Sequence, residues 1–241
     1  MDPVAELTQI AQEVRVCTQC PLHTTRKLSV PGEGPSNAQI LFIGEGPGHN
    51  ENEQGRPFVG AAGKFLDELL EKAGLQRRHV FICNVVKCRP PNNRDPEPQE
   101  ILACGKYLDR QIAAINPKVI VTLGRFSMNK FFPSARISQI HGRASRVDGR
   151  LVVAMYHPAA ALHQPNLRPE LEADFAGLAK LLHPDSVEKQ QEKAASLPVV
   201  EEKSQPAPAP DLFSFIENPE PQDQTSEQAD DPNEPKQLNL F

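Results

Sequence analysis

Short, uninterrupted apolar runs alternate with segments of helical periodicity over the first 184 residues. The apolar runs cover residues 39–43, 79–86, 118–123 and 151–155. Runs that are apolar throughout, rather than at every second position, are typical of strands covered on both faces, as in a parallel sheet. Residues 4–16, 65–73 and 101–115 instead place apolar side chains three and four positions apart, which indicates amphipathic helices. The alternation predicts an α/β fold, a three-layer α/β/α sandwich with a central, mainly parallel four-stranded sheet.

The loops that follow the four apolar runs carry glycine, proline and polar residues. They begin at Gly44, Lys87, Gly124 and Tyr156. In an open parallel sheet, ligands bind at the carboxyl ends of the strands, where such loops meet. We therefore predict one convergent site that these loops share.

The composition changes near residue 184. The last 57 residues hold 13 acidic and 4 basic residues and several alternating prolines, so they contain too little apolar surface to offset the entropy of ordering. We expect a folded domain at 1–184 and a disordered acidic, proline-rich tail at 185–241. Residues 1–184 have a net charge of +4. A mild excess of this kind is compatible with a nucleic-acid partner and equally with a soluble enzyme that binds no polyanion.

The start of the chain indicates a cytoplasmic protein. Residues Met1, Asp2 and Pro3 begin no basic and apolar leader, and the apolar runs are too short to span a bilayer. The five cysteines would then be in a reducing compartment, where ligands and reactive thiols are commoner than disulfides. An odd number also argues against a complete disulfide framework.

Four cysteines have a spacing that is compatible with one metal centre. Cys17 and Cys20 form a Cys-x2-Cys pair, Cys88 and Cys104 follow much later, and Cys83 lies inside an apolar run as an expected buried thiol. Four thiolates are the ligand set of both zinc and iron–sulfur clusters. The spacing by itself does not distinguish the two.

Five short motifs follow one another along the chain. They are Cys17-x2-Cys20-Pro21-Leu22, Gly44-Glu45-Gly46-Pro47-Gly48, Gly55-Arg56-Pro57-Phe58-Val59-Gly60, Asn84-x3-Cys88-Arg89-Pro90-Pro91 and His157-Pro158-Ala159. In this order they resemble the family 4 uracil-DNA glycosylases over residues 5–183. The resemblance implies the uracil-DNA glycosylase fold, uracil-containing DNA as substrate, and hydrolysis of the N-glycosidic bond to an abasic site in base excision repair. It also implies a [4Fe-4S] cluster on Cys17, Cys20, Cys88 and Cys104, with zinc as the alternative.

The resemblance assigns roles to individual residues. Phe58 would stack on the uracil ring. Asn84 would read its edge, since an amide can accept from N3–H and donate to O4. His157 would donate to O2, where negative charge grows as the bond breaks. Glu45 would position the attacking water, which makes Glu45, Asn84 and His157 the expected catalytic residues.

Other residues complete the expected uracil site. Gly44 and Gly46 allow the backbone beside Glu45 to approach the base, and Glu51 matches a position near uracil C5 that excludes the methyl group of thymine. Gly46 stands where many relatives have alanine. Residues 159–163 read Ala-Ala-Ala-Leu-His where many relatives have an aromatic residue and an arginine, so the family's details of DNA clamping do not carry over to this segment, whereas the chemistry does. Candidates for contacts with DNA phosphates are Arg56, Lys87, Arg89, Arg94 and Arg143.

The tail ends in a short motif. Gln237, Leu238, Leu240 and Phe241 lie in Gln-Leu-Asn-Leu-Phe, which resembles the bacterial sliding-clamp-binding peptide. We expect residues 237–241 to recruit a monomeric, nucleoid-associated enzyme to the clamp of a bacterium. Two alternatives remain open. One is a deaminated-base glycosylase with broader specificity, although Glu45 favours family 4 over family 5, and the other is a catalytically silent iron–sulfur DNA-binding module.

Overall fold

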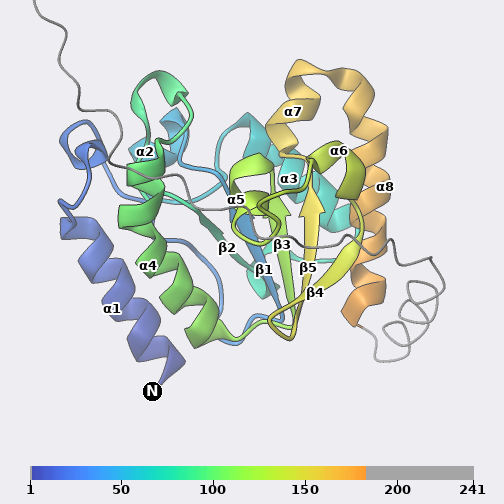
Figure 1. Ribbon diagram of the computed structural model, residues 1–241, viewed down its shortest axis with the longest axis horizontal. Coiled ribbons are helices and arrows are strands. Elements are labelled where there is room, and N and C mark those ends of the chain that lie inside the picture. The colour runs from blue at the N-terminus through green and yellow to red at the C-terminus, as the bar shows by residue number, and fades with distance from the viewer. Residues whose placement is uncertain (1, 183–241) are drawn as a thin grey trace, which may run out of the picture. The chain divides into compact units, whose positions relative to one another are not determined.

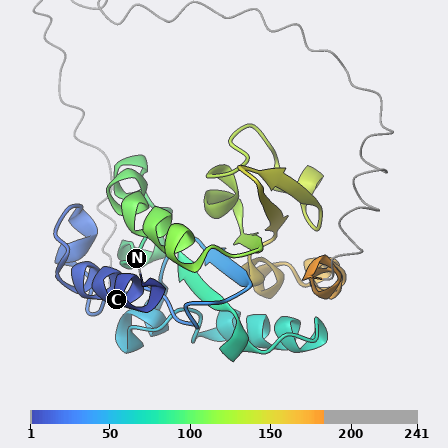
Figure 2. The same ribbon diagram turned by 90° about the horizontal axis from the view of Figure 1, so that it is seen from below.

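The computed structural model describes residues 2–182 and contains a five-stranded mixed sheet between two layers of helices (Figures 1 and 2). The spatial order of the strands is β2-β1-β3-β5-β4, and every neighbouring pair is parallel except β4 with β5. The strands are β1 (Ile40–Gly44), β2 (Phe81–Asn84), β3 (Val119–Leu123), β4 (Ala144–Val147) and β5 (Arg150–Met155). The expected α/β/α sandwich is confirmed. The tail at 185–241, including the 237–241 motif, lies outside the described residues.

The three predicted helices are present among eight α-helices in residues 2–182. The α-helices are α1 (Pro3–Val16), α2 (His49–Gln54), α3 (Ala61–Lys72), α4 (Pro98–Ile115), α5 (Arg125–Asn129), α6 (Ile137–Ile140), α7 (Pro158–His163) and α8 (Arg168–Leu178). Short 3-10 turns occupy Pro21–Thr24, Arg77–His79, Pro91–Asn93, Pro165–Leu167 and Ala179–Leu182. None of the helices in this part of the chain is long and apolar enough to cross a bilayer.

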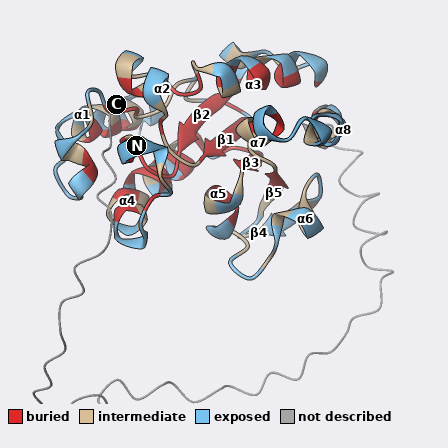
Figure 3. Ribbon diagram, turned by 90° about the horizontal axis from the view of Figure 1, so that it is seen from above, coloured by how far each residue is buried: buried red, intermediate tan, exposed pale blue. Residues whose placement is uncertain are grey.

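The two faces of the sheet bury separate cores, because successive side chains of a strand point to opposite faces. Phe42 of β1 packs in the core formed with α3 and α8, where its ring stacks on Phe175. Leu41 and Ile43 of the same strand pack in the core formed with α1 and α4. All five residues of β1 and of β3 are buried (Figure 3). This double coverage explains why these strands are apolar throughout.

The predicted number of strands was one too few. Strand β4 is an edge strand whose pattern Ala-Ser-Arg-Val is only partly buried, so it has no continuous apolar run. It pairs antiparallel with β5 through a two-residue turn at Asp148 and Gly149, whose φ angles are 48° and 79°. Positive φ at both turn residues is the geometry that Asp-Gly favours in hairpins. The Asp-Gly pair was therefore the signal in the sequence for this strand.

Strand β2 is shorter than the predicted run of 79–86. His79 belongs to a 3-10 turn, and β2 ends at Asn84. Val85 and Val86 stay close to the sheet because their N–H groups donate to the carbonyls of Gly44 and Glu45. The loops after β1 and β2 are thereby joined directly beyond the strand ends.

Candidate functional site

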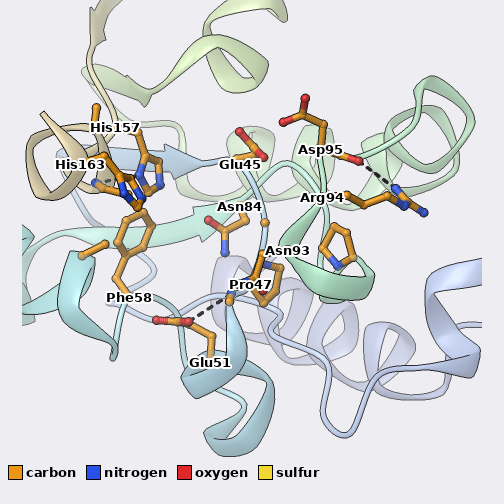
Figure 4. A pocket seen from close by; sticks show the side chains of 16 residues that line it. Glu45, Pro47, Glu51, Phe58, Asn84, Asn93, Arg94, Asp95, His157 and His163 are labelled. Atoms are coloured by element: carbon orange, nitrogen blue, oxygen red, sulfur yellow. Dashed lines mark hydrogen bonds between the residues drawn. The ribbon is translucent and has the colours of Figure 1, made fainter. Parts of the chain in front are cut away.

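A pocket of about 560 Å³ opens at the carboxyl ends of β1, β2 and β5 (Figure 4). Pockets of this size commonly bind small molecules or extruded groups. Loops from three of the four predicted positions line it. Its lining residues include Glu45, Gly46, Pro47, Gly48, Glu51, Phe58, Ala62, Asn84, Pro90, Asn93, Arg94, Asp95, His157, Ala159, Ala160 and His163. The fourth loop, at Gly124, lies behind the pocket wall, where a Cβ on Gly124 would come within 3.2 Å of His157 Cβ.

Phe58 forms an apolar wall of the pocket and is held in an unusual backbone conformation. Its φ of 51° lies in the left-handed region, which is uncommon for an aromatic residue. Arg77 donates hydrogen bonds to the carbonyls of Pro57 (2.6 Å) and Phe58 (3.2 Å) and to Asp67 (3.0 Å). Gly63 of α3 leaves room for the Phe58 carbonyl, since a Cβ there would lie only 2.0 Å from its oxygen. These contacts hold a conformation that would otherwise be costly.

Asn84 ends strand β2 and is buried beside Phe58. Its side chain is 1% exposed, and its Oδ1 is a buried acceptor with no hydrogen-bond partner in residues 2–182. Gly44, the partner of Asn84 in the sheet register, leaves the space that the amide and the Phe58 ring occupy. A Cβ on Gly44 would lie 2.4 Å from Asn84 Oδ1 and 2.7 Å from Phe58 Cζ. An unpaired buried acceptor costs about 1–3 kcal/mol, so this amide is available to a ligand.

His157 begins helix α7 and lies against Phe58. The N–H of Ala159 donates to His157 Nδ1 at 3.1 Å, so the neutral ring carries its proton on Nε2. The two rings stack with centroids 5.5 Å apart. Burial lowers the pKa of His157 to about 4, against the opposing effect of the Glu51 charge. The ring is therefore a neutral donor near pH 7.

Glu45 follows β1 and lies in the pocket between Asn84 and Asp95 in the view of Figure 4. Burial raises the pKa of this carboxyl to about 6, and the charge of Asp95 acts in the same direction. Arg125 acts in the opposite direction and also forms an ion pair with Asp95. A carboxyl with this pKa is mostly ionised at pH 7 and can accept a proton.

Glu51 accepts backbone hydrogen bonds from two separate loops beside the pocket. Its carboxylate accepts from the N–H groups of Gly48 (3.1 Å), Val59 (2.8 Å) and Gly60 (2.9 Å). This residue of α2 therefore joins the loop after β1 to the loop that carries Phe58. The structure leaves Glu51 in the pocket lining, where it was predicted, and adds this cross-linking contact.

Several pocket residues were not predicted to belong to the site. His163 lies on the wall with His157 and Phe58, whereas Asn93 and Asp95 lie across from it in Figure 4. The irregular sequence from Arg89 to Asp95, in the loop that follows β2, was the available signal for Asn93 and Asp95. Lys87 was a candidate for DNA phosphates, and this prediction is wrong, because its side chain is buried and 1% exposed.

The four expected cysteine ligands line a second cavity, which lies between the end of α1, the loop after β2 and α4. Cys88 Sγ accepts from Arg26 at 3.2 Å, and Cys104 Sγ accepts from the backbone N–H of Lys87 at 3.3 Å. Burial raises the pKa of Cys104 to about 11 and also raises the pKa values of Cys20 and Cys88. Cys83 is buried in the sheet and does not line this cavity, as expected.

Within residues 2–182, no group of three or more His, Cys, Asp or Glu side chains is arranged to hold a single metal ion. One ion with four thiolate ligands requires each sulfur within about 2.3 Å of the same point. In a cluster the thiolates bind different irons, so the sulfurs surround a larger volume. The shared cavity and its two hydrogen-bond donors are compatible with such a group.

Comparisons with known proteins find one matching family model and several similar enzymes. Residues 31–179 match the family model described as the uracil DNA glycosylase superfamily. The chain is similar to the type-4 uracil-DNA glycosylase of Archaeoglobus fulgidus, with 48% identity over 73% of this chain and 92% of the relative. It is 51% identical to the type-4 enzyme of Saccharolobus solfataricus, over 73% of this chain and 86% of the relative. A type-5 enzyme of Pyrobaculum aerophilum is 32% identical over 54% of this chain and 65% of the relative.

Proposed function

Because the chain belongs to the uracil DNA glycosylase superfamily, and within it to the type-4 enzymes, we propose that its pocket binds a uracil extruded from DNA. The chain is a uracil-DNA glycosylase, a hydrolase of DNA repair that acts on uracil-containing DNA. A base inside a duplex is inaccessible, so the nucleotide must leave the stack before reaction. What remains to be assigned is the part that each residue plays.

The observation that carries the assignment is the unpartnered Oδ1 of Asn84 beside the ring of Phe58. Uracil N3–H would donate to this oxygen, and the amide NH₂ would donate to uracil O4. Cytosine has an acceptor at N3 and a donor at C4, so it would leave the amide mismatched at about 1–3 kcal/mol. The Phe58 ring would stack on the flat face of the base. The backbone at Gly44 and Gly46 leaves the space for this approach.

His157 would stabilise the departing base. As the bond between C1′ and N1 breaks, the electron pair stays on uracil and its charge spreads to O2. A neutral Nε2–H held in place by the Nδ1 contact to Ala159 can donate to this oxygen without prior rearrangement. The donor is most valuable in the transition state, where the charge is largest.

Glu45 would orient the water that replaces uracil. The water oxygen adds to C1′, and its proton passes to the carboxylate, which is mostly ionised at pH 7. Glu51 would close the pocket near uracil C5 and thereby exclude the methyl group of thymine. Its three backbone contacts fix its position for this purpose.

We also propose that Cys17, Cys20, Cys88 and Cys104 hold a [4Fe-4S] cluster. The support is their common cavity and the two N–H donors to sulfur. When bound, the cluster would link the end of α1 to the loop after β2 and to α4. Visible absorbance together with iron and sulfide analysis of the purified protein tests this, and zinc in their place would refute it.

Release of uracil from a single-uracil oligonucleotide tests the assignments in the pocket. Asn84→Ala and His157→Ala should each lower the single-turnover rate by at least about 100-fold, in line with the loss of one preorganised donor. His79→Ala changes an exposed histidine outside the pocket and should leave the rate unchanged. Equal rates in all four proteins would remove the site assignment. Oligonucleotides with hypoxanthine in place of uracil distinguish a broader specificity.

We further propose that residues 237–241 bind the sliding clamp of a bacterial host and that the enzyme is a cytoplasmic monomer. The motif Gln-Leu-Asn-Leu-Phe supports clamp binding, with Leu240 and Phe241 as the apolar contacts. Tethering would raise the local concentration of enzyme at replicating DNA. Binding of the full chain to a purified clamp, compared with Leu240→Ala and Phe241→Ala, tests the motif. Light scattering tests the monomer.

A further inference from the structure

Lys87 is a buried lysine between the two sites. Its ammonium donates to the backbone carbonyl of Asn84 at 2.7 Å and to Gln111 Oε1 at 2.6 Å. Gln111 is in turn held by the carbonyl of Pro31, to which its amide donates at 2.7 Å. The backbone N–H of Lys87 donates to Cys104 Sγ. One residue therefore contacts both the proposed base-reading residue and an expected cluster ligand.

The positive charge of Lys87 lacks an adjacent carboxylate. Within residues 2–182 its ammonium contacts the neutral oxygens of Asn84 and Gln111 and the thiol of Cys83, and no carboxylate lies within 4.0 Å of its nitrogen. A buried cation without a counter-charge is costly. Lys87 does line the cavity of the four cysteines. Four thiolates outweigh the charge of an iron–sulfur core, so a bound cluster would be an anion close to this lysine.

We propose that Lys87 is a positioning residue that holds Asn84 for base reading and takes its counter-charge from the four-cysteine centre. Its ammonium fixes the carbonyl of Asn84, and through it the direction in which the side-chain amide leaves the end of β2. The inference rests on the proposed role of Asn84. Through Lys87, the four-cysteine centre would influence the position of the Asn84 amide in the pocket.

A double-variant cycle tests the connection to Asn84. Lys87→Met keeps the alkyl chain and removes the charge, and it should lower the single-turnover rate about 10- to 100-fold, as expected for one lost charged hydrogen bond. If Lys87 acts through Asn84, the double variant with Asn84→Ala should react within about twofold of Asn84→Ala alone. Multiplied effects, or an unchanged rate in Lys87→Met, would overturn the inference. A wild-type rate in Asn84→Ala would instead overturn the proposed role of Asn84.

Cluster retention is the second measurement and does not depend on activity. The visible absorbance of Lys87→Met should bleach several-fold faster than that of the wild type in the presence of a chelator. Equal bleaching would overturn the proposed counter-charge. Lys118→Met, which removes an exposed lysine, should match the wild type in both assays. Should Lys87→Met fail to fold, Gln111→Leu removes the other oxygen acceptor, and its effect should likewise not add to that of Asn84→Ala.

Discussion

The ionisation of Glu45 should set the acid limb of the pH–rate profile. Its pKa is about 6, and the proposed role requires the carboxylate form. About ten elevenths of this group is ionised at pH 7 and about one eleventh at pH 5, so kcat/KM should fall about tenfold between these values. His157, with a pKa of about 4, stays neutral over this range and should add no second inflection.

Two neighbouring charges make the prediction sharper. Asp95→Asn removes the negative charge that raises the pKa of Glu45, so the midpoint should move to lower pH. Arg125→Met removes the charge that lowers it, so the midpoint should move to higher pH. The assay is uracil release at subsaturating oligonucleotide, where kcat/KM reports the free enzyme. A midpoint that persists in Glu45→Gln, or shifts in the same direction in both charge variants, would refute the reasoning.

Three further predictions concern the framework of the pocket. Arg77→Met removes the donors that hold the carbonyls of Pro57 and Phe58. It should lower the free energy of unfolding in urea by about 1–3 kcal/mol and raise the KM for the oligonucleotide. An unchanged KM would contradict the role of Arg77 in positioning the Phe58 ring. Glu51→Gln removes the charge that three N–H groups share and should lower the unfolding temperature more than Glu71→Gln, an exposed control; equal temperatures would argue against the cross-link. The pKa of His157 is lower in the folded state than its ordinary 6.5, so the unfolded state binds the proton more readily. The free energy of unfolding should therefore decrease as the pH falls from about 6.5 toward about 4. The full shift corresponds to at most about 3 kcal/mol, which His157→Ala should remove from the pH dependence of urea unfolding.

The buried elements could be predicted from the sequence because burial leaves a pattern. The runs at β1 and β3 are covered on both faces and contain apolar residues almost throughout, so they were found with little ambiguity. Strand β4 is short, its two middle residues are exposed and its end residues are only partly buried, so its sequence resembles that of a loop. Its evidence lies in the two turn residues that follow it.

In the candidate site, too, some features could be predicted from the sequence and others could not. Phe58, Asn84 and His157 follow recognisable motifs, and the structure brings them into one pocket. The contacts that support them involve residues far away in sequence, such as Arg77 with Phe58. The burial of Lys87 could not be read from its neighbours, because lysine is normally exposed and its acceptors come from β2 and α4. Short motifs identify the groups that react, whereas tertiary contacts decide how they are held.

Gly44 restricts how this pocket can diversify. Any larger residue there must displace the amide of Asn84 and the ring of Phe58 together, since a Cβ at this position would lie 2.4 Å from Asn84 Oδ1 and 2.7 Å from Phe58 Cζ. A lineage that acquires a new base preference therefore has no gradual mutational route through this position. The first substitutions in such a lineage would have to occur at other residues that line the pocket, such as Ala62 or Ala160, where a small side chain already borders open space.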